Sequence, residues 1–352
     1  MRLLVLGGTE FVGRTVVEAA LARGWEVTVF HRGRHRPPPG VRSLHGDRTA
    51  PDGLAALAAD GGTWDAVVDT WSAAPRAVLD AARLLCGRAG RYAYLSSRSV
   101  YAWPRPPAGG DVEDGALVDG AAADAGPTDY PRDKRGGERA AVEAFGAQNS
   151  LLVRAGLILG PYENIGRLPW WLSRMARGGP VLAPGPRSLA LQFIDARDLA
   201  AWLLGAVEQN LSGPYDLVGP PGHTTMGDLL EACVRVTGSG AELRWTEPAV
   251  LAEAGIEPWT QLPVWVPPDS ETYDALHRAD VTRALATGLV CRPAAETVAD
   301  TWRWLTEIGG SAPQRPDRAA VGLDPEVEAK VLAGPRWGVV AGTTPRERAS
   351  GE

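Results

Sequence analysis

The chain has 352 residues, and its hydrophobic content of 45% and charged content of 22% are ordinary for a globular protein. The formal net charge of −6 and the pI of about 5.5 argue against the broad positive surface that attracts nucleic-acid phosphates, so no nucleic-acid partner is expected. A chain of this length is too long for a single small domain, and we predict a large α/β domain with a smaller second lobe.

Cysteine and histidine are few and scattered. Cys86, Cys233 and Cys291 are far apart, which argues against a disulfide framework or a zinc site and suits a reducing, cytoplasmic location. The five histidines show no pair at metal-ligand spacing, so no metal is predicted. The apolar start 3–6 is too short for a signal-peptide core and is interpreted as a first strand. No run approaches transmembrane length, so no membrane partner is expected.

Short β-prone runs alternate with helical patterns through the first half of the chain. After the first strand, the β-prone runs are at 27–30, 65–69, 91–95 and 151–154. The patterns with helical spacing between them are at 15–23, 77–85 and 134–145. This alternation predicts βαβ units in a parallel sheet, and right-handed crossovers make that sheet doubly wound, with helices on both faces. Ligands of such sheets bind at the carboxyl ends of the strands.

The first strand runs into a glycine turn that opens a helix. Gly7 permits a tight turn after the strand, and Gly13 allows the helix to pack closely against the sheet. The N–H groups and positive dipole end of that helix suit a pyrophosphate, which predicts a dinucleotide site. Glu10 replaces the middle glycine of the usual pattern, and its carboxylate is unfavourable there unless it points away. The candidate pyrophosphate-binding residues are Gly7, Gly8, Thr9, Phe11, Val12 and Gly13.

The end of the second strand predicts which dinucleotide binds. An acidic residue there would hold the ribose 2′-hydroxyl of NAD, whereas a basic one favours the 2′-phosphate of NADP. The chain has His31-Arg32-Gly33-Arg34 and no acid at this point, and the planar Arg32 guanidinium suits a phosphate. We therefore predict NADP, with NAD as the alternative because Glu10 would oppose the same phosphate. Further candidate contacts at strand ends are Asp47, which would accept from the adenine amino group, Arg48 and Thr70.

The composition changes after Gly160-Pro161, where Pro, Gly and Trp become frequent. We predict a dinucleotide-binding domain over 1–165, to which 189–218 returns as a further strand-helix unit. Residues 166–188 and 219–310 are predicted to form a smaller mixed α/β substrate lobe at the C-terminal side. Five tryptophans are candidates to line a pocket there, although core packing is the expected fate of any single one: Trp103, Trp170, Trp171, Trp259 and Trp265.

Two further segments lack regular patterns over most of their length. The loop 102–128 is rich in Gly, Ala, Pro and Asp, and its place between two candidate catalytic residues favours an active-site lid over a plain surface loop. The tail 311–352 is rich in Pro, Arg and Gly and carries one short helical pattern at 324–333. The end of this tail is expected to fray.

The candidate catalytic residues are Ser97, Tyr130 and Lys134. A free phenol is a poor base at neutral pH, and a nearby ammonium stabilises its phenolate form. Tyr130 and Lys134 are four positions apart at a helix start, so they share one face. Ser97, at a strand end, would hydrogen-bond the substrate oxygen, Tyr130 would move the proton, and Lys134 would also hold the nicotinamide ribose.

These motifs resemble the extended or atypical short-chain dehydrogenases/reductases, the NAD-dependent epimerase/dehydratase group, over 1–306. The resemblance implies a Rossmann-type lobe, a nicotinamide cofactor, a small-molecule substrate and a catalytic trio at Ser97, Tyr130 and Lys134. A homodimer is common in that group and is a candidate assembly. The matching motifs are Gly7-Gly8-Thr9…Gly13, Asp47-Arg48, Ser96–Tyr101, Tyr130…Lys134, Arg154…Gly160-Pro161, Phe193–Asp198 and the run from Ala279 through Trp302.

Departures from that group narrow the reaction. Sugar-nucleotide dehydratases carry an Asp-Glu pair after the catalytic Ser or Thr, whereas this chain has Arg98-Ser99, so dehydration is not expected. Leu191 stands where sugar-nucleotide enzymes often place an arginine, which leaves a nucleotide-sugar substrate open. The leading hypothesis is an NAD(P)-dependent reductase or dehydrogenase of a small carbonyl or alcohol. The alternatives are a nucleotide-sugar epimerase and a non-catalytic nucleotide-sensing or RNA-binding member of the fold.

Overall fold

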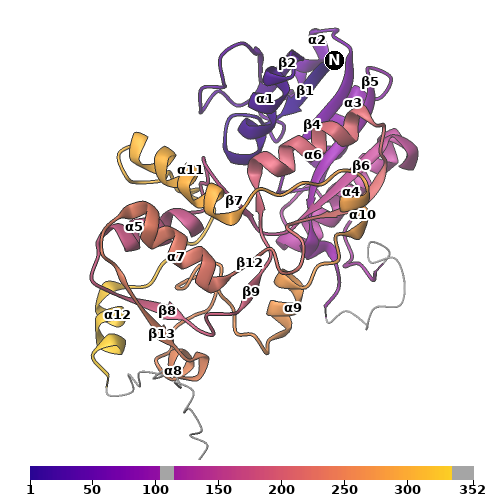
Figure 1. The fold of residues 1–352 in the computed structure, drawn as a ribbon. Helices are drawn as coiled ribbons and strands as arrows, with labels where there is room; N and C mark the ends of the chain where they lie inside the picture. Colours follow the sequence, from indigo (N-terminus) through magenta and orange to yellow (C-terminus); the bar gives the residue numbers. More distant parts are fainter. Residues whose placement is uncertain (104–114, 335–352) are drawn as a thin grey trace, which may run out of the picture.

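The computed structural model describes residues 1–103 and 115–334, which form two lobes (Figure 1). The sheet lobe contains a parallel sheet with its covering helices. The second lobe contains most of the chain after residue 156, together with the last described helix. Two predictions reach beyond these residues, because 104–114 of the predicted lid loop and 335–352 of the tail lie outside the described part.

The sheet lobe is built on a seven-stranded sheet in the order β11-β6-β5-β4-β1-β2-β3, with every neighbouring pair parallel. This order confirms the predicted doubly wound, Rossmann-type α/β class. The strand order reverses between β1 and β4, so the carboxyl ends of these two strands border the crevice where such folds bind ligands. The strands are β1 (Arg2–Leu6), β2 (Glu26–His31), β3 (Arg42–His45), β4 (Trp64–Asp69), β5 (Ala89–Ser97), β6 (Ser150–Ala155) and β11 (Gly213–Leu217).

Helices cover both faces of this sheet because successive strand residues point to opposite sides. Leu3 and Val5 of β1 join the core under α1 and α6, whereas Leu4 and Leu6 join the core under α3 and α4. The helical elements of this lobe are α1 (Phe11–Ala22), α2 (Ala55–Ala59), α3 (Arg76–Leu85), η1 (Arg98–Val100), α4 (Tyr130–Phe145), η3 (Ala147–Asn149) and α6 (Ala196–Glu208).

The second lobe has its own apolar core, in which Trp171 and Trp265 are almost completely buried. Their indole N–H groups donate to the backbone oxygens of Pro263 and Gly185 at 2.7 and 3.0 Å. These two tryptophans are therefore packing residues and do not line a pocket. The remaining elements, among which α10 packs on the sheet-lobe core, are β7 (Ile158–Leu159), α5 (Arg167–Ala176), β8 (Pro180–Pro184), β9 (Ala190–Leu191), β10 (Ile194–Asp195), β12 (Thr224–Thr225), α7 (Met226–Thr237), β13 (Glu242–Thr246), α8 (Pro248–Glu253), α9 (Glu271–His277), α10 (Thr282–Ala286), α11 (Ala294–Glu307) and α12 (Pro325–Leu332).

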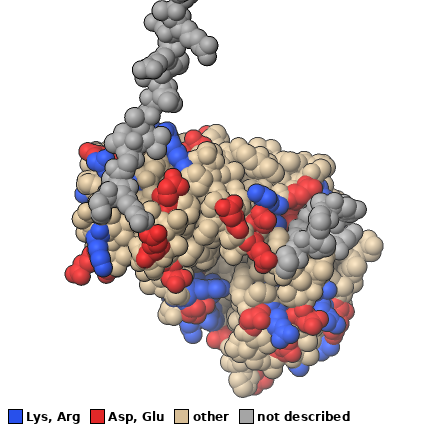
Figure 2. All heavy atoms as spheres, turned by 90° about the horizontal axis from the view of Figure 1, so that it is seen from below, with Lys and Arg blue, Asp and Glu red and all other residues tan. Residues whose placement is uncertain are grey.

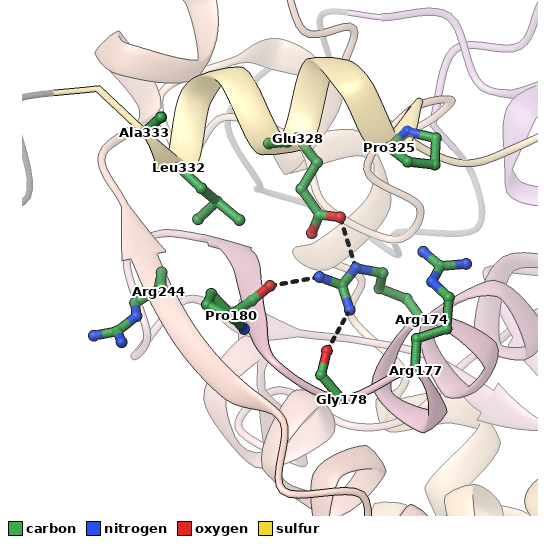
Figure 3. Close-up of a pocket in the computed structure, with 10 residues that line it drawn as sticks. Arg174, Arg177, Gly178, Pro180, Arg244, Pro325, Glu328, Leu332 and Ala333 are labelled. Atoms are coloured by element: carbon green, nitrogen blue, oxygen red, sulfur yellow. Dashed lines mark hydrogen bonds and ion pairs between the residues drawn. The ribbon is translucent and has the colours of Figure 1, made fainter.

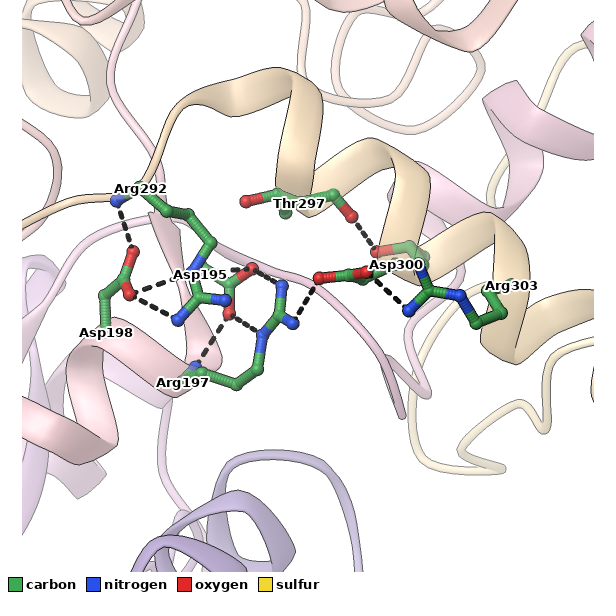
Figure 4. Close-up of polar contacts among 8 residues, drawn as sticks. Asp195, Arg197, Asp198, Arg292, Thr297, Asp300 and Arg303 are labelled. Carbon is green, nitrogen blue, oxygen red and sulfur yellow. Dashed lines mark hydrogen bonds and ion pairs between the residues drawn. The ribbon is translucent and has the colours of Figure 1, made fainter. Parts of the chain in front are cut away.

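An ion-pair network joins the two lobes at the start of α6 (Figure 4). Asp195 caps α6 by accepting from the backbone N–H of Arg197 at 2.8 Å. The Arg197 guanidinium bridges Asp195 and Asp300 of α11, with N–O distances of 2.7 and 2.5 Å. Arg292 pairs with Asp198 at 2.7 Å. Since α6 packs in the sheet-lobe core and α11 in the second-lobe core, the network holds one lobe against the other.

The segment after α11 returns to the second lobe. The Gly322 N–H donates to the Thr260 carbonyl at 2.7 Å, and Leu323 is buried in the second-lobe core. Asp324 then caps α12, which corresponds to the helical pattern at 324–333. The segment between Ser311 and Leu323 is thus fixed at both ends.

Acidic and basic side chains are interspersed on the face of the molecule that Figure 2 shows.

The chain opens with β1 in the middle of the sheet, as the apolar run at 3–6 predicts. Within residues 1–103 and 115–334, none of the helices combines the length and the apolar character that crossing a bilayer requires.

Candidate active site

The glycine turn lies between the end of β1 and the start of α1, beside the end of β4. Gly7 and Gly8 have φ of +118° and +84°, which side chains other than glycine rarely adopt. A Cβ added at Gly13 would lie 2.7 Å from the Gly8 nitrogen. The Thr70 hydroxyl donates to the Leu6 carbonyl at 3.1 Å and flanks the turn. These contacts let the start of α1 lie directly against the end of β1.

The first turn of α1 offers backbone donors to the crevice. The N–H groups of Phe11, Val12 and Gly13 precede the first intrahelical bond, which the Arg14 N–H donates to the Glu10 carbonyl at 3.1 Å. The side chain of Glu10 does not cap this helix. A cradle of close-packed glycines with uncapped N–H donors fits the pyrophosphate of a dinucleotide.

The Glu10 carboxylate is engaged by groups outside the glycine turn. Its Oε1 accepts from Asn164 Nδ2 at 3.1 Å and lies 3.4 Å from His35 Nε2. These contacts link the carboxylate to the loop before α5 and to the loop after β2. They moderate the unfavourable charge that the sequence places at the middle position of the glycine pattern.

Residues at the ends of β2 and β3 form a second part of the crevice. The buried His31 packs against His45, with ring centroids 4.5 Å apart, and Arg32 is exposed beyond it. Asp47 accepts from the Thr49 hydroxyl and N–H at 2.7 and 3.0 Å. These bonds, with a smaller contribution from the charge of Arg32, hold the pKa of the Asp47 carboxyl below its usual value. The structure therefore brings Arg32 and Asp47 near each other.

Arg48, a predicted cofactor contact, is paired with a carboxylate at the end of β4. Its guanidinium forms two hydrogen bonds to Asp69, at 2.7 and 2.8 Å, and lies 4.8 Å from the centroid of the Trp71 ring. Asp69 also accepts from the Tyr92 hydroxyl at 2.5 Å. Although burial opposes ionisation, Arg48 keeps the pKa of Asp69 below its usual value. These contacts hold the Arg48 guanidinium against the end of β4.

Tyr130 and Lys134 lie together at the start of α4, where Asp129 caps the helix by accepting a first-turn N–H at 2.9 Å. Lys134 Nζ is 6.0 Å from the centroid of the Tyr130 ring. It donates to the carbonyl oxygens of Trp71 and Leu95, each at 2.6 Å. The lysine thereby ties α4 to the ends of β4 and β5, while Tyr130 stays 36% exposed.

The charge of Lys134 is sensitive to its surroundings. Burial lowers the pKa of this lysine to about 7, Asp69 opposes the shift, and the positive charges of Arg315 and Arg318 add to it. A lysine that titrates near neutrality in a crevice is a candidate for chemistry as well as for structure.

Ser97 ends β5, two residues beyond the Leu95 carbonyl that accepts from Lys134. Its Oγ accepts from the N–H and the hydroxyl of Ser99 at 3.2 and 3.0 Å. A serine hydroxyl has two acceptor sites and one proton, so this arrangement leaves the Ser97 proton to donate to another oxygen.

A buried polar network supports the strand end below Ser97. Glu138 of α4 accepts from Ser96 Oγ at 2.7 Å and from Arg154 Nε at 2.8 Å. Arg154 also donates to the Tyr101 hydroxyl at 3.1 Å, which donates to Asp216 at 2.7 Å. The network connects α4, β5, β6 and β11 and fixes the positions of Lys134 and Ser97 relative to each other.

Three arginines that the sequence analysis did not select border the same crevice. The Arg318 guanidinium carbon lies 4.9 Å from the centroid of the Tyr130 ring. Arg167 begins α5, and the charges of Tyr130 and Arg318 both act on it. Arg315 lies beside the loop before α5. In the sequence, only the Arg-rich composition of the tail pointed to these residues. No spacing connects Arg315 and Arg318 to the catalytic motif.

Other parts of the molecule give less support for a ligand site. A cavity of about 690 Å³ lies between α5, β8 and α12 (Figure 3). Its central Arg174 is already bound to Glu328 at 2.6 Å and to the carbonyl oxygens of Gly178 and Pro180. Among residues 1–103 and 115–334, no group of three or more His, Cys, Asp or Glu side chains is placed to hold a metal ion.

Comparisons with known proteins identify the family of the chain. The sequence model of the NAD dependent epimerase/dehydratase family matches residues 3–217. A curated relative, the epimerase family protein SDR39U1 of Bos taurus, is 28% identical over 279 residues, which are 73% of this chain and 87% of that protein.

Solved structures share the fold at low sequence identity. The Bordetella bronchiseptica enzyme WbmH, in complex with NAD+, has a TM-score of 0.64 at 18% identity, over 88% of this chain and 99% of that one. The UDP-glucose 4-epimerase of Thermotoga maritima, solved with UDP-glucose, has a TM-score of 0.63 at 16% identity, over the same shares.

Proposed function

The chain belongs to the NAD dependent epimerase/dehydratase family and is a nicotinamide-dependent oxidoreductase or epimerase; on that premise we propose that it is a reductase or dehydrogenase of a small carbonyl or alcohol. One observation carries the proposal. Lys134 binds the Leu95 carbonyl at 2.6 Å, with the Tyr130 ring 6.0 Å away and Ser97 two residues further along β5. A proton donor, a cation and a hydroxyl donor thus meet at one end of the sheet.

The cofactor that fits this crevice is NADP, with NAD as the alternative. The N–H groups at the start of α1 would hold the pyrophosphate, Arg32 the 2′-phosphate and Asp47 the adenine amino group. Thr9, His31 and Thr70 would line the same groove, and Lys134 would hold the nicotinamide ribose. When bound, such a cofactor supplies a donor or acceptor of hydride.

Three side chains of this chain would handle the proton and the substrate oxygen. Ser97 donates its hydroxyl proton to the substrate oxygen and so fixes its position. Tyr130 gives a proton from its phenol oxygen during reduction, or takes one during oxidation. Positive charge on Lys134 and Arg318 stabilises the phenolate of Tyr130 between these two events.

A fluorescence titration with NADPH and with NADH tests the cofactor assignment. We expect tighter binding of NADPH, because only NADPH carries the phosphate that Arg32 can reach. Arg32→Ala is expected to weaken NADPH binding about tenfold and to leave NADH binding nearly unchanged. Arg36→Ala, an exposed arginine in the same loop, is the matched control. Preference for NADH in the unsubstituted protein would contradict the NADP assignment.

Gly13→Val tests the glycine cradle in the same titration. Its side chain would meet the Gly8 backbone, so we expect both dinucleotides to lose affinity together. Binding of neither dinucleotide to the unsubstituted protein, once freed of any retained cofactor, would remove the basis of the proposed reaction.

A nucleotide-sugar epimerase is the second candidate, because a solved structure with the same fold is a UDP-glucose 4-epimerase. The same trio would serve it, and the absence of net cofactor consumption would distinguish it from a reductase. Dinucleotide binding without turnover of either substrate class would favour a nucleotide-sensing protein.

A further inference from the structure

The segment 311–323 crosses the crevice on its way from α11 to α12. The Arg315 N–H donates to the Asn164 carbonyl at 3.0 Å, and Asn164 Nδ2 donates to Glu10 at 3.1 Å. Gln314 packs directly on Gly166, the residue before α5. Asn164 therefore links this segment to Glu10, the residue before α1, and so to the helix start at the proposed dinucleotide site.

The anchors of this segment do not depend on its charges. The Gly322 N–H donates to the Thr260 carbonyl at 2.7 Å, and Gly322 lies against the indole of Trp170 with no room for a side chain. Leu323 is 4% exposed in the second-lobe core. A neutral residue at Arg318 leaves all of these contacts in place.

Arg318 lies over the ring of Tyr130, and Arg167 is close enough for the charges of both residues to act on it. Arg318 comes from the tail, with its guanidinium carbon 4.9 Å from the centroid of the Tyr130 ring. Arg167 comes from α5 and stacks on Trp259 at 4.7 Å. In both arginines, Nε is buried and has no hydrogen-bond partner among the described residues. Buried guanidinium donors without an acceptor cost stability, and an acceptor oxygen of a bound ligand would remove that cost.

The neighbouring carboxylates have hydrogen-bond partners of their own, although the charge of Glu163 also acts on Arg167. Asp317 binds Arg315 through both oxygens, at 3.0 and 2.5 Å. Glu163 accepts from the backbone N–H groups of Arg167 and Leu168 at 2.7 and 3.2 Å. Burial also raises the pKa of Glu163 to about 7, so its negative charge is incomplete near neutrality. Positive charge is left in excess above Tyr130.

We propose that Arg318 and Arg167 bind an anionic group of the substrate, a carboxylate or a phosphate, and hold its carbonyl over Tyr130. This inference rests on the proposed function, which makes Tyr130 the reacting end of the crevice. Arginine suits the role because its planar fork pairs with both anions in a fixed orientation. The tail thus supplies a specificity-determining residue to a site whose chemistry lies in the sheet lobe.

Binding of simple anions tests the pair without any turnover. Calorimetric titration of the dinucleotide-loaded protein with inorganic phosphate and with malonate, at constant ionic strength, is expected to show binding of at least one of them. Arg318→Gln and Arg167→Gln should each weaken it by about 10- to 100-fold, and Arg318→Lys should restore part of the loss. Arg278→Gln is the matched control, because Arg278, the residue after α9, also lies over a tyrosine ring, that of Tyr273 at 5.6 Å.

Paired substrates test the role in specificity. Rates are compared for dihydroxyacetone phosphate against dihydroxyacetone, and for 4-oxopentanoate against its methyl ester. We expect kcat/KM to favour the charged member of at least one pair, with the preference lost in Arg318→Gln mainly through KM. A preference in the first pair would identify the bound group as a phosphate, and a preference in the second pair would identify it as a carboxylate.

The outcomes separate this inference from the proposed function. Turnover with equal kcat/KM for charged and neutral members would overturn the anion site and leave the reductase in place. Anion binding that requires Arg318, without turnover of any carbonyl, would leave the anion site and remove the reductase. Anion binding unchanged by both substitutions would mean an adventitious ion only. A loss of NADPH affinity in Arg318→Gln as large as the loss of anion affinity would assign the arginine to the cofactor and overturn the proposal.

Discussion

The crevice has a floor and a wall, and the two are held in different ways. The floor consists of the glycine turn, Ser97 and the Tyr130–Lys134 pair, and its side chains are fixed by strand ends and by buried ion pairs. The wall consists of α5 and the segment 311–323, which brings Arg318 over the same phenol. In the floor, Lys134 and the network below Ser97 have hydrogen-bond partners, whereas in the wall the Nε groups of Arg167 and Arg318 are buried with no partner among the described residues.

This difference separates two tasks within one site. A proton-transfer group needs a fixed position and a controlled charge, which the hydrogen bonds of Lys134 and the buried network below Ser97 provide. A group that recognises a substrate needs donors that stay available until the substrate arrives. The floor is therefore assigned to the chemistry and the wall to the choice of substrate.

The largest expected effect is on the chemistry of the floor. Tyr130→Phe removes the phenol oxygen but keeps the ring that Arg318 and Lys134 approach, so activity should fall by about 10²- to 10⁴-fold. NADPH binding, followed by fluorescence, should remain nearly unchanged. An active Tyr130→Phe protein with the expected cofactor affinity would show that proton transfer does not belong to the floor.

The next largest expected effect is a change in the free energy of unfolding when the buried network of the floor is broken. Glu138→Leu leaves the buried Arg154 without its carboxylate and should lower the free energy of unfolding by about 3–5 kcal/mol. Glu143→Leu on the same helix removes an exposed pair with Arg83 and should cost less than about 1 kcal/mol. Equal losses for both variants in urea unfolding would mean that the floor is not held by its buried network.

The effect that is smallest at neutral pH is the pH dependence that Lys134 gives to stability. Because burial lowers the pKa of Lys134 to about 7, the unfolded chain binds more protons than the folded protein between that pH and 10.5. This lysine therefore makes the folded protein relatively more stable as pH rises through that range. Lys134→Met should remove the rise, measured as the difference in unfolding free energy between variant and parent from pH 7 to 10. Parallel curves for the two proteins would mean that Lys134 keeps an ordinary affinity for protons.

Much of the floor was predictable from sequence because its signals are local. The glycine turn, the i, i+4 spacing of Tyr130 and Lys134, and the alternation of strand and helix patterns each depend on a few neighbouring residues. Parallel strands bring their carboxyl ends to one edge of a sheet, so the strand pattern by itself indicates that residues at several strand ends lie near each other. The doubly wound class followed from the same alternation and is confirmed.

Long-range packing decided what the local signals could not. Asp47-Arg48 matched a cofactor motif, yet Arg48 pairs with Asp69, which is 21 positions away. Trp171 and Trp265 were pocket candidates by composition, and the hydrogen bonds of their indoles place them in the second-lobe core. Nothing within a short window of sequence distinguishes a pocket wall from a packing residue.

The sequence by itself determined the parallel sheet, the glycine turn and the shared helix face of Tyr130 and Lys134, because hydrophobic periodicity and helix geometry act over short distances. Only the tertiary structure decided which distant residues close the crevice. Arg318 lies far along the chain from Tyr130 and reaches it because Leu323 is buried in one core while α4 is anchored to another. Such contacts arise from the closure of long loops over packed lobes, and no local pattern encodes them.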